Sequence, residues 1–473
     1  MKTKNKIRLF SIVIAIGLLI TVSCDDYLSI VPKGERIPTT LSDFALMLKD
    51  EYNTHHIDVT QALILLNDRY VTTSNLNYYP LYDANYNWDE SANRIELNKS
   101  DEGAYYFGYA AISTSNLIIE NVPDATEATE AERNKVIAQS KVLRAMSYFN
   151  LVNYYSDTYV ASTAADKGGV PLITSANMNA PHTQPSVKGI YDFMLQDMQE
   201  AYDDLPETAE TILHPDKATA DAFYARLYLQ MGNYDQALSH ADKALTANDA
   251  LFDWVTFYDN HKGVIENPED FSTRLPSPMG FDYVENYNFR HGTVASYQSS
   301  ENSVTLERME IFEEGDARAT ARWKLYTVGN ESYYRSSMTG YYNYGGMTTV
   351  EVYLIKAECL ARSGKYQEAM DVVNTVRETR ILPEHYQPLT ASTEAEAMTY
   401  IIQTKGNEMI MTQVPFIDAR RLNAEGKYPV TRSKVLDGVT LTLSPTSHLW
   451  TMPFPQGAVE NPGNGTITQN VSK

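Results

Sequence analysis

Residues 217–245, KATADAFYARLYLQMGNYDQALSHADKAL, decide how the rest of this chain is interpreted. Small side chains recur on both sides of a short segment that contains Gly232. Small side chains let two antiparallel helices approach closely, while aromatic side chains fill the groove between them. The stretch therefore predicts a helical hairpin. Its small and aromatic positions are Ala225, Tyr228, Tyr234, Ala237 and Ala244.

A second copy of this pattern lies at 351–377, EVYLIKAECLARSGKYQEAMDVVNTVR. Its matching positions are Ala357, Leu360, Gly364, Tyr366, Ala369 and Val376. Two copies at matching spacing indicate tetratricopeptide-like units, whose hairpins cannot bury their apolar faces alone. We therefore predict a mostly α-helical fold. Hairpins near 129–205, 217–245 and 351–377 form its scaffold, and a long irregular, loop-rich insertion lies at 249–346.

The first 23 residues are typical of a secretory signal. Four basic residues precede an uncharged apolar run at 9–22, which at 14 residues is too short to span a bilayer. The run ends at Thr21-Val22-Ser23-Cys24, which resembles a bacterial lipobox with Thr21 in place of the usual leucine. We predict that residues 1–23 are removed and that Cys24 is lipidated. The alternative is an ordinary signal followed by a chance cysteine.

Charge and composition limit the possible ligands. The formal net charge of −21 makes the chain repel phosphate backbones, so nucleic acid is excluded as a ligand. The 34 tyrosines far outnumber the 14 phenylalanines and 4 tryptophans. Tyrosine combines an apolar face with a polar rim, which suits sugars but also suits helical cores. The second cysteine, Cys359, lies inside a repeat helix and is predicted to be a buried small hydrophobe.

Two segments outside the hairpins concentrate the aromatic residues. In NLNYYPLYDANYNWDES, at 75–91, the aromatic spacing fits neither a helix nor a strand and predicts a loop that uses its apolar surface. The insertion at 249–346 is too long to be structureless in a compact domain unless it is functional. We predict that both segments bind the ligand, although their aromatic residues could instead pack onto the helices. The predicted ligand-binding residues are Trp88, Tyr86, Tyr283, Tyr287 and Tyr297.

No pattern predicts a metal site or a catalytic site. The adjacent His55 and His56 cannot share one helix face, which favours a solvated loop. Alternate polar residues at 83–89 resemble a calcium loop, but Trp88 stands where that loop needs glycine and Arg94 where it needs an acid. The chain also lacks a phosphate-binding glycine loop, a Gly-x-Ser-x-Gly elbow and a His-Glu-x-x-His helix. We predict a protein that is not an enzyme and has no cofactor.

Three passages resemble one known family. Cys24 is followed by Asp-Asp-Tyr-Leu, the run KVLRAMSYFNLVNYYSD at 141–157 is followed by Gly-Gly-Val-Pro-Leu at 168–172, and the ending contains Pro-Phe-Pro-Gln at 453–456. Together they resemble the SusD-like (RagB/SusD) nutrient-binding outer-membrane lipoproteins of Bacteroidota. The resemblance runs from Cys24 to the C-terminus. It weakens at 407–417, where the chain lacks acids that relatives usually carry.

The resemblance implies a single domain at 24–473, in which the early loop and the insertion face the ligand and the repeats pack against a transporter. The implied function is a non-catalytic, lipid-anchored protein exposed at the surface of the outer membrane. It would capture oligosaccharides and deliver them to a SusC-like TonB-dependent transporter. Two alternatives remain: capture of peptides or glycopeptides with the same transporter arrangement, and a purely structural repeat scaffold.

Overall fold

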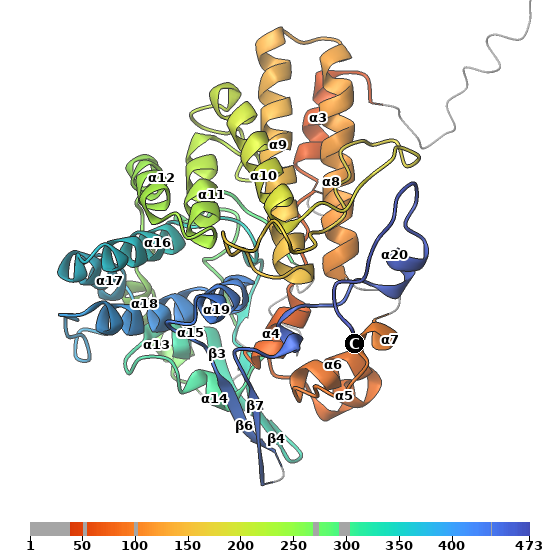
Figure 1. Ribbon diagram of the computed structural model, residues 1–473. Coiled ribbons are helices and arrows are strands. Elements are labelled where there is room, and N and C mark those ends of the chain that lie inside the picture. The colour runs from red at the N-terminus through yellow and green to blue at the C-terminus, as the bar shows by residue number, and fades with distance from the viewer. Residues whose placement is uncertain (1–37, 51–53, 99–102, 268–273, 293–302, 437) are drawn as a thin grey trace, which may run out of the picture.

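The computed structural model describes residues 38–50, 54–98, 103–267, 274–292, 303–436 and 438–473. Its helices pack into a tall body, and its small sheets lie toward one end (Figure 1). The helices are α3 (Leu41–Leu48), α4 (Thr60–Leu66), α5 (Thr73–Tyr78), α6 (Pro80–Tyr86), α7 (Arg94–Leu97), α8 (Gly103–Asn121), α9 (Glu130–Tyr155), α10 (Val187–Ala201), α11 (Lys217–Gln230), α12 (Tyr234–Ala247), α13 (Trp254–Ile265), α14 (Leu306–Met309), α15 (Ala317–Arg322), α16 (Thr349–Arg362), α17 (Tyr366–Glu378), α18 (Glu394–Glu408), α19 (Val414–Glu425) and α20 (Gln456–Glu460).

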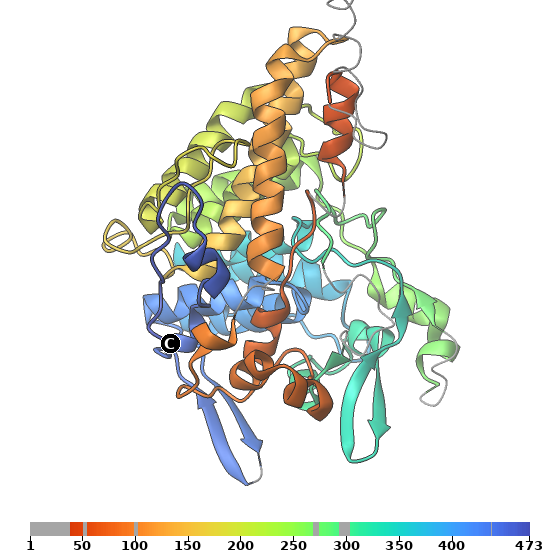
Figure 2. The same ribbon diagram turned by 90° about the vertical axis from the view of Figure 1, so that its right-hand side faces the viewer.

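The strands form three small sheets. They are β1 (Leu275–Pro276), β2 (Ser303–Val304), β3 (Trp323–Val328), β4 (Glu331–Ser336), β5 (Met338–Thr339), β6 (Arg432–Leu436) and β7 (Val439–Leu443). β1 pairs with β5 in parallel, β4 lies between β2 and β3 in an antiparallel sheet, and β6 pairs with β7. The β3–β4 and β6–β7 ribbons both extend from the lower end of the molecule (Figures 1 and 2).

The two predicted repeat hairpins are confirmed as α11–α12 and α16–α17. Their turns contain Gly232 at φ +73 and Gly364 at φ +83, a left-handed conformation that glycine adopts without a steric penalty. Ala237 and Ala369 follow these turns and are fully buried. The hairpins also pack on each other through α12 and α16, so each covers an apolar face of the other. The mostly α-helical, tetratricopeptide-like fold class is therefore confirmed.

A long helix, α9, joins the repeats to the rest of the body. It begins at the predicted capping box: the Thr129 hydroxyl accepts from the Glu132 N–H, and the Glu132 carboxylate accepts from the Thr129 N–H. α9 packs between α8 and α10. Its end is capped by Arg420 of α19, whose guanidinium donates to the carbonyls of Asn153 and Ser156.

The two segments predicted as loops contain more regular structure than expected. Residues 75–91 include most of α5 and all of α6, and the insertion at 249–346 includes α13 to α15 and β1 to β5. The cause is local capping. The Thr72 hydroxyl accepts from the Asn75 N–H at the start of α5, and Pro80 occupies the first turn of α6, where its missing N–H is not needed.

Buried apolar side chains form three clusters. The largest runs through α8 to α12, the second joins α13 and α15 to β3, and the third lies among α16, α17 and α18. Cys359 is buried as predicted, and burial raises the pKa of its thiol to about 12. Among the described residues, no helix is both long enough and apolar enough to cross a bilayer.

Candidate functional site

Three tyrosines of α5 and α6 face outward at the lower end of the molecule. Tyr78 is 75 % exposed and Tyr79 is 44 % exposed, while Tyr82 is half-buried. The ring centroids of Tyr78 and Tyr79 lie 4.7 Å apart, and those of Tyr79 and Tyr82 lie 4.8 Å apart. We call these three residues the tyrosine ledge. Exposed aromatic residues in mutual contact form an apolar platform on an otherwise polar surface.

A cavity of about 330 Å³ lies beside the ledge, within the usual size range of small-molecule sites. Its lining residues are Asp58, Thr60, Gln61, Tyr79, Pro80, Leu81, Tyr82, Leu97, Asn98 and Gly103. The cavity therefore combines two aromatic rings of the ledge with carboxylate, amide and hydroxyl groups.

Several polar atoms of this cavity are available to a ligand. The Gln61 side chain uses its oxygen to accept from Asn85, and the Asn98 side chain uses its nitrogen to donate to the Pro453 carbonyl. Asp58 accepts from the Thr60 N–H through Oδ1. Among the described residues, no partner binds Gln61 Nε2, Asn98 Oδ1 or Asp58 Oδ2. One donor and two acceptors thus remain for hydroxyl groups.

The start of α8 closes the cavity against Asp58. A Cβ atom at Gly103 would lie 2.3 Å from Asp58 Oδ2, far inside van der Waals contact. A side chain at position 103 would therefore require the Asp58 carboxylate to move away from the start of α8.

A second group of aromatic rings begins two residues before Asp58. The His56 ring stacks on Phe107 at 4.1 Å and lies 5.5 Å from His291. The His291 ring lies 5.8 Å from Tyr341, which is 44 % exposed and lies 5.2 Å from Phe281. Rings at 56 and 107 therefore meet rings of the insertion. His56 and Phe107 lie outside the early loop at 75–91, so a ligand-facing surface shared by that loop and the insertion stays a prediction.

The prediction of a solvated loop at His55 and His56 is wrong, because both side chains are buried. The His55 ring is bonded to the Leu48 carbonyl, and burial, followed by the charge of Arg290, lowers its pKa to about 3. Burial and His291 lower the pKa of His56 to about 4. Both rings are therefore neutral at physiological pH. Within the described part of the chain, no cluster of three metal-ligating side chains occurs.

The prediction for Trp88 rests on its place in a polar, aromatic-rich segment, and the structure instead places its ring in the core, the alternative given for that segment. Trp88 is only 7 % exposed, belongs to the largest core cluster and donates its indole N–H to the Leu65 carbonyl at 2.7 Å. Its backbone has φ +52, which is rare for a bulky residue, and this turn carries the ring inward after α6. Tyr86 lies beside it, half-buried, and its ring is covered by Lys434.

Two of the predicted tyrosines of the insertion, Tyr283 and Tyr287, do not join the ledge. Tyr283 is buried and its hydroxyl accepts from the Trp254 indole N–H at 3.3 Å. Tyr287 is buried and donates to the Asn248 carbonyl at 2.6 Å. Burial raises the pKa of both hydroxyls. The predictions for Tyr297 and for the lipidation of Cys24 fall outside the described residues.

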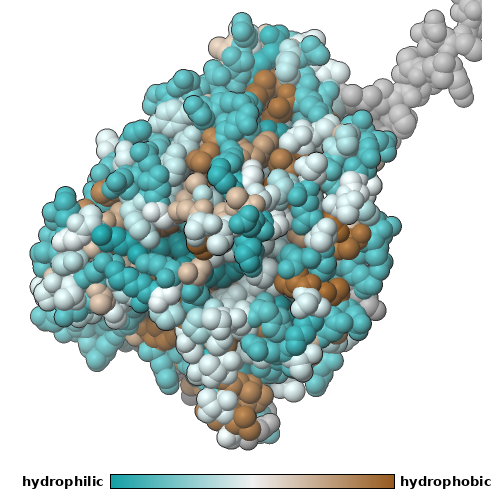
Figure 3. Space-filling view, in the orientation of Figure 1, coloured by the Kyte–Doolittle hydropathy of each residue, from teal (hydrophilic) through white to brown (hydrophobic). Residues whose placement is uncertain are grey.

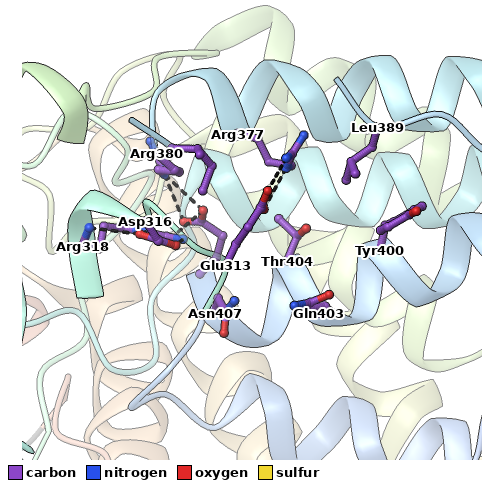
Figure 4. Close-up of a pocket in the computed structure, with 12 residues that line it drawn as sticks. Glu313, Asp316, Arg318, Arg377, Arg380, Leu389, Tyr400, Gln403, Thr404 and Asn407 are labelled. Atoms are coloured by element: carbon purple, nitrogen blue, oxygen red, sulfur yellow. Dashed lines mark hydrogen bonds and ion pairs between the residues drawn. The ribbon is translucent and has the colours of Figure 1, made fainter. Parts of the chain in front are cut away.

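A second cavity, of about 220 Å³, lies between α17, α18 and the segment before α15 (Figure 4). Its three guanidinium groups are matched by three carboxylates. Arg377 pairs with Glu313, Arg318 with Asp316 and Glu408, and Arg380 with Glu408. The cavity is therefore not a strongly acidic cleft. Its charged side chains pair with one another and connect the insertion to the second repeat.

Most of the surface in the view of Figure 3 is hydrophilic. A compact apolar area lies at its lowest point, at the tip of the β6–β7 ribbon. There Val435 is 69 % exposed and Val439 is 59 % exposed. These side chains are aliphatic, so they lack the flat ring faces on which sugars stack.

Comparison with known proteins gives a consistent result. Residues 26–229 match a family model described as "Starch-binding associating with outer membrane". The chain is 26 % identical to SusD-like protein P2 of Formosa agariphila over 364 residues, which cover 66 % of this chain and 70 % of that protein. It is 22 % identical to SusD-like protein P38 of the same organism, covering 58 % of this chain and 62 % of that protein.

Solved structures share the fold. A SusD superfamily protein from Bacteroides thetaiotaomicron matches with a TM-score of 0.67 at 17 % identity, covering 92 % of this chain and 100 % of that one. A SusD-like carbohydrate-binding protein from Bacteroides vulgatus matches with a TM-score of 0.65, also at 17 % identity and with the same coverage. Identities this low establish the shared fold alone. None of these names is that of an enzyme.

Proposed function

We propose that this chain, which matches the SusD-like family model over residues 26–229, captures oligosaccharides at the cell surface without catalysis and passes them to a SusC-like TonB-dependent transporter. In this proposal residues 24–473 act as one domain. The observation that carries it is the tyrosine ledge beside a cavity with polar atoms that no described residue occupies.

The proposed mechanism is reversible binding through two kinds of contact, stacking on tyrosine rings and hydrogen bonding to sugar hydroxyls. The apolar face of a sugar ring packs on Tyr79 or Tyr78, which are exposed and already in contact with each other, so little side-chain freedom is lost on binding. Hydroxyl groups of the same sugar bond to Asp58, Gln61 and Asn98 in the cavity. Trp88 supports the segment from beneath and does not touch the ligand.

The charge arrangement supports a neutral ligand over the runner-up, a cationic peptide. A cleft built for cationic peptides would carry unpaired carboxylates, whereas the charged cavity of Figure 4 balances its acids with arginines. Among the described residues that line the ledge cavity, Asp58 is the only acid. Hydroxyl-rich, uncharged oligosaccharides fit this balance of one carboxylate, two amides and two rings.

Titration calorimetry with a panel of maltoheptaose, cellohexaose, xylohexaose, mannohexaose and laminarihexaose tests the proposal. At least one should bind the wild type, and Tyr79→Ala should weaken that binding by about 30-fold, which corresponds to the usual ~2 kcal/mol of a binding hot spot. Tyr400→Ala, which alters the charged cavity instead, is the matched control and should bind normally. Loss of affinity in Tyr400→Ala but not in Tyr79→Ala would move the site to the charged cavity.

The proposed membrane attachment is a lipid on Cys24, from the apolar run and small residues before it. Metabolic labelling with a palmitate analogue should mark the wild type, and Cys24→Ala should lose the label. Label retained by that variant would exclude this cysteine as the attachment point.

The proposed transporter partner follows from the family and not from any motif in the chain. Detergent extraction of native membranes followed by pull-down should recover a large outer-membrane barrel with this protein. Recovery of the protein alone, under conditions that preserve related complexes, would argue for a free binding protein or a structural scaffold.

A further inference from the structure

The C-terminal ribbon reaches the segment that carries the tyrosine ledge through one side chain. Lys434 of β6 places its ammonium 3.8 Å from the ring centroid of Tyr86 and 5.1 Å from that of Trp88. The same group donates to the Tyr86 carbonyl at 2.5 Å and to Asn87 Oδ1 at 3.2 Å. Four contacts thus join one cation to three consecutive residues at the end of α6.

No acid among the described residues is in contact with this cation. In the described part of the chain Lys434 forms no salt bridge, and the carboxylates that act on it, Glu307 of α14 and Asp83 of α6, do so from a longer range. Burial outweighs them and lowers the pKa of Lys434 to about 8. The Tyr86 ring beneath the ammonium carries a hydroxyl whose pKa is raised by burial, and β7, which pairs with β6, contributes no charged residue.

A buried lysine with a lowered pKa costs stability. Between about pH 8 and the ordinary lysine pKa of ~10.4, the unfolded chain holds this proton more tightly than the folded protein. The charged Lys434 therefore lowers stability at neutral pH, and this cost disappears as pH rises through that window. A cation kept at such a cost is better explained by a role in positioning than by a role in holding the fold together.

The residues that Lys434 contacts set the shape of the ledge segment. Trp88, at φ +52, adopts a backbone conformation that persists only where neighbours enforce it. The Tyr86 carbonyl is fixed by Lys434 and by the Asn67 side chain together. Tyr86 also lies one helical turn after Tyr82, on the same face of α6. A shift at Tyr86 is therefore passed directly to a ledge residue.

The other ribbon holds the opposite end of the segment. Glu331 of β4 accepts from the Thr73 N–H at the start of α5 at 2.9 Å. The ledge thus lies between two fixed ends, and both ribbons extend from the same end of the molecule as α5 and α6 (Figures 1 and 2).

We propose that Lys434 is a positioning residue of the ligand site: by seating its ammonium on Tyr86 and bonding to the Tyr86 carbonyl and Asn87, it holds α6 so that Tyr79 and Tyr82 face the ligand. This inference rests on the proposed oligosaccharide site. It requires the positive charge at 434 and makes affinity depend on that charge.

The test compares wild type, Lys434→Met, Lys434→Arg and the control Lys262→Met in the mature full chain. Lys262 also lies over a tyrosine, Tyr258, but on α13. With the best oligosaccharide of the panel at pH 7, Lys434→Met should bind about tenfold more weakly, whereas Lys434→Arg and Lys262→Met should stay within about threefold. A purely structural role predicts a lower melting temperature for Lys434→Met; positioning predicts one equal to or above that of the wild type.

The pH profile supplies the second readout. Wild-type and Lys262→Met affinity should fall by about five- to tenfold between pH 7 and pH 9, because the charged fraction of a lysine with a pKa near 8 falls by that factor. Lys434→Arg should show no such fall, since arginine stays charged. A flat wild-type profile together with unchanged affinity in Lys434→Met would overturn the proposal.

A ligand-free measurement separates this inference from the proposed function. Hydrogen exchange of residues 83–89 should accelerate several-fold in Lys434→Met and stay at the wild-type rate in Lys434→Arg and Lys262→Met. If no oligosaccharide binds even the wild type, the proposed function fails, and accelerated exchange would still establish the hold of Lys434 on α6. Unchanged exchange in Lys434→Met would overturn it whatever the ligand.

Discussion

Tyrosines of the first repeat and tyrosines of the ledge have the same chemistry and opposite surroundings. In the repeat, the rings of Tyr224 and Tyr228 lie 4.5 and 5.6 Å from His240, which faces them from α12. In the ledge, Tyr78 and Tyr79 contact each other and extend into solvent. The difference is that a second helix, α12, packs over the tyrosines of the repeat. A tyrosine becomes core where a partner element covers it and becomes a platform where none does, so composition alone cannot assign its role.

The largest effect on the scaffold should come from removing a buried carboxylate that pairs with an arginine there. Arg421 donates through both Nη atoms to the two oxygens of buried Glu358, at 2.7 and 2.9 Å. Glu358→Gln leaves that buried guanidinium with only the Asp418 carboxylate, at 3.3 Å, and should cost about 3 kcal/mol of unfolding free energy, measured by urea denaturation. Glu368→Gln, in an exposed pair with Lys365, should cost less than about 0.5 kcal/mol.

The same pair predicts a pH dependence for the scaffold. Burial acts to raise the pKa of Glu358, but Arg421 and Arg362 outweigh it and lower the pKa to about 2. A carboxyl with a folded pKa below its unfolded value stabilises the protein above the unfolded pKa of ~4.3, and this contribution is lost as pH falls from about 5 toward 2. Below about pH 5, the free energy of unfolding of Glu358→Gln should therefore fall less steeply with decreasing pH than that of the wild type. An identical pH dependence would contradict the assignment.

Trp88 tests the comparison from the other side, because it lies in the ledge segment but behaves as scaffold. Its ring is buried and bonded to Leu65, so Trp88→Ala should remove about 3 kcal/mol of stability through the cavity it leaves. Circular dichroism and urea denaturation measure this directly. A Trp88→Ala variant that keeps full stability but loses ligand affinity would show that Trp88 contributes to ligand binding after all.

The smallest expected effect concerns the close approach of helices in the repeat. Ala237 follows the turn of the first hairpin and is fully buried. Ala237→Leu adds volume where α11 and α12 are already in contact and should cost about 1–3 kcal/mol through overpacking. Binding measured at a temperature where the variant is folded should be unchanged. An unaltered melting temperature would show that the hairpin has room at this position.

The scaffold could be predicted from sequence because its signals are local and repeated. Small residues recur at helical spacing, glycines stand at both turns, and the Thr129 capping box begins α9 at the expected residue. Each of these signals depends only on residues a few positions apart in the sequence. The fold class therefore follows from the chain without knowledge of which elements meet.

The site could be predicted only in part, because its geometry depends on distant contacts. The segment at 75–91 was correctly singled out as aromatic, but no local rule indicates that Trp88 turns inward at φ +52. One available signal was missed: Tyr78 and Tyr79 are adjacent and precede Pro80, and neighbouring residues cannot share one buried face. Asp58, Gln61 and Asn98 come from separate segments that only the fold brings together.

The two contacts that fix the ledge segment also decide when it can form during synthesis. The contact of Thr73 requires Glu331, 258 residues later in the chain, and the contact of Tyr86 requires Lys434, 348 residues later. The repeats need only neighbouring residues for their turns, so they can close while the chain is still being made. The ledge segment matures last, after β6 has been added. A nascent chain that has completed both repeat hairpins therefore still lacks the Lys434 contact that fixes the segment carrying the tyrosines at 78, 79 and 82.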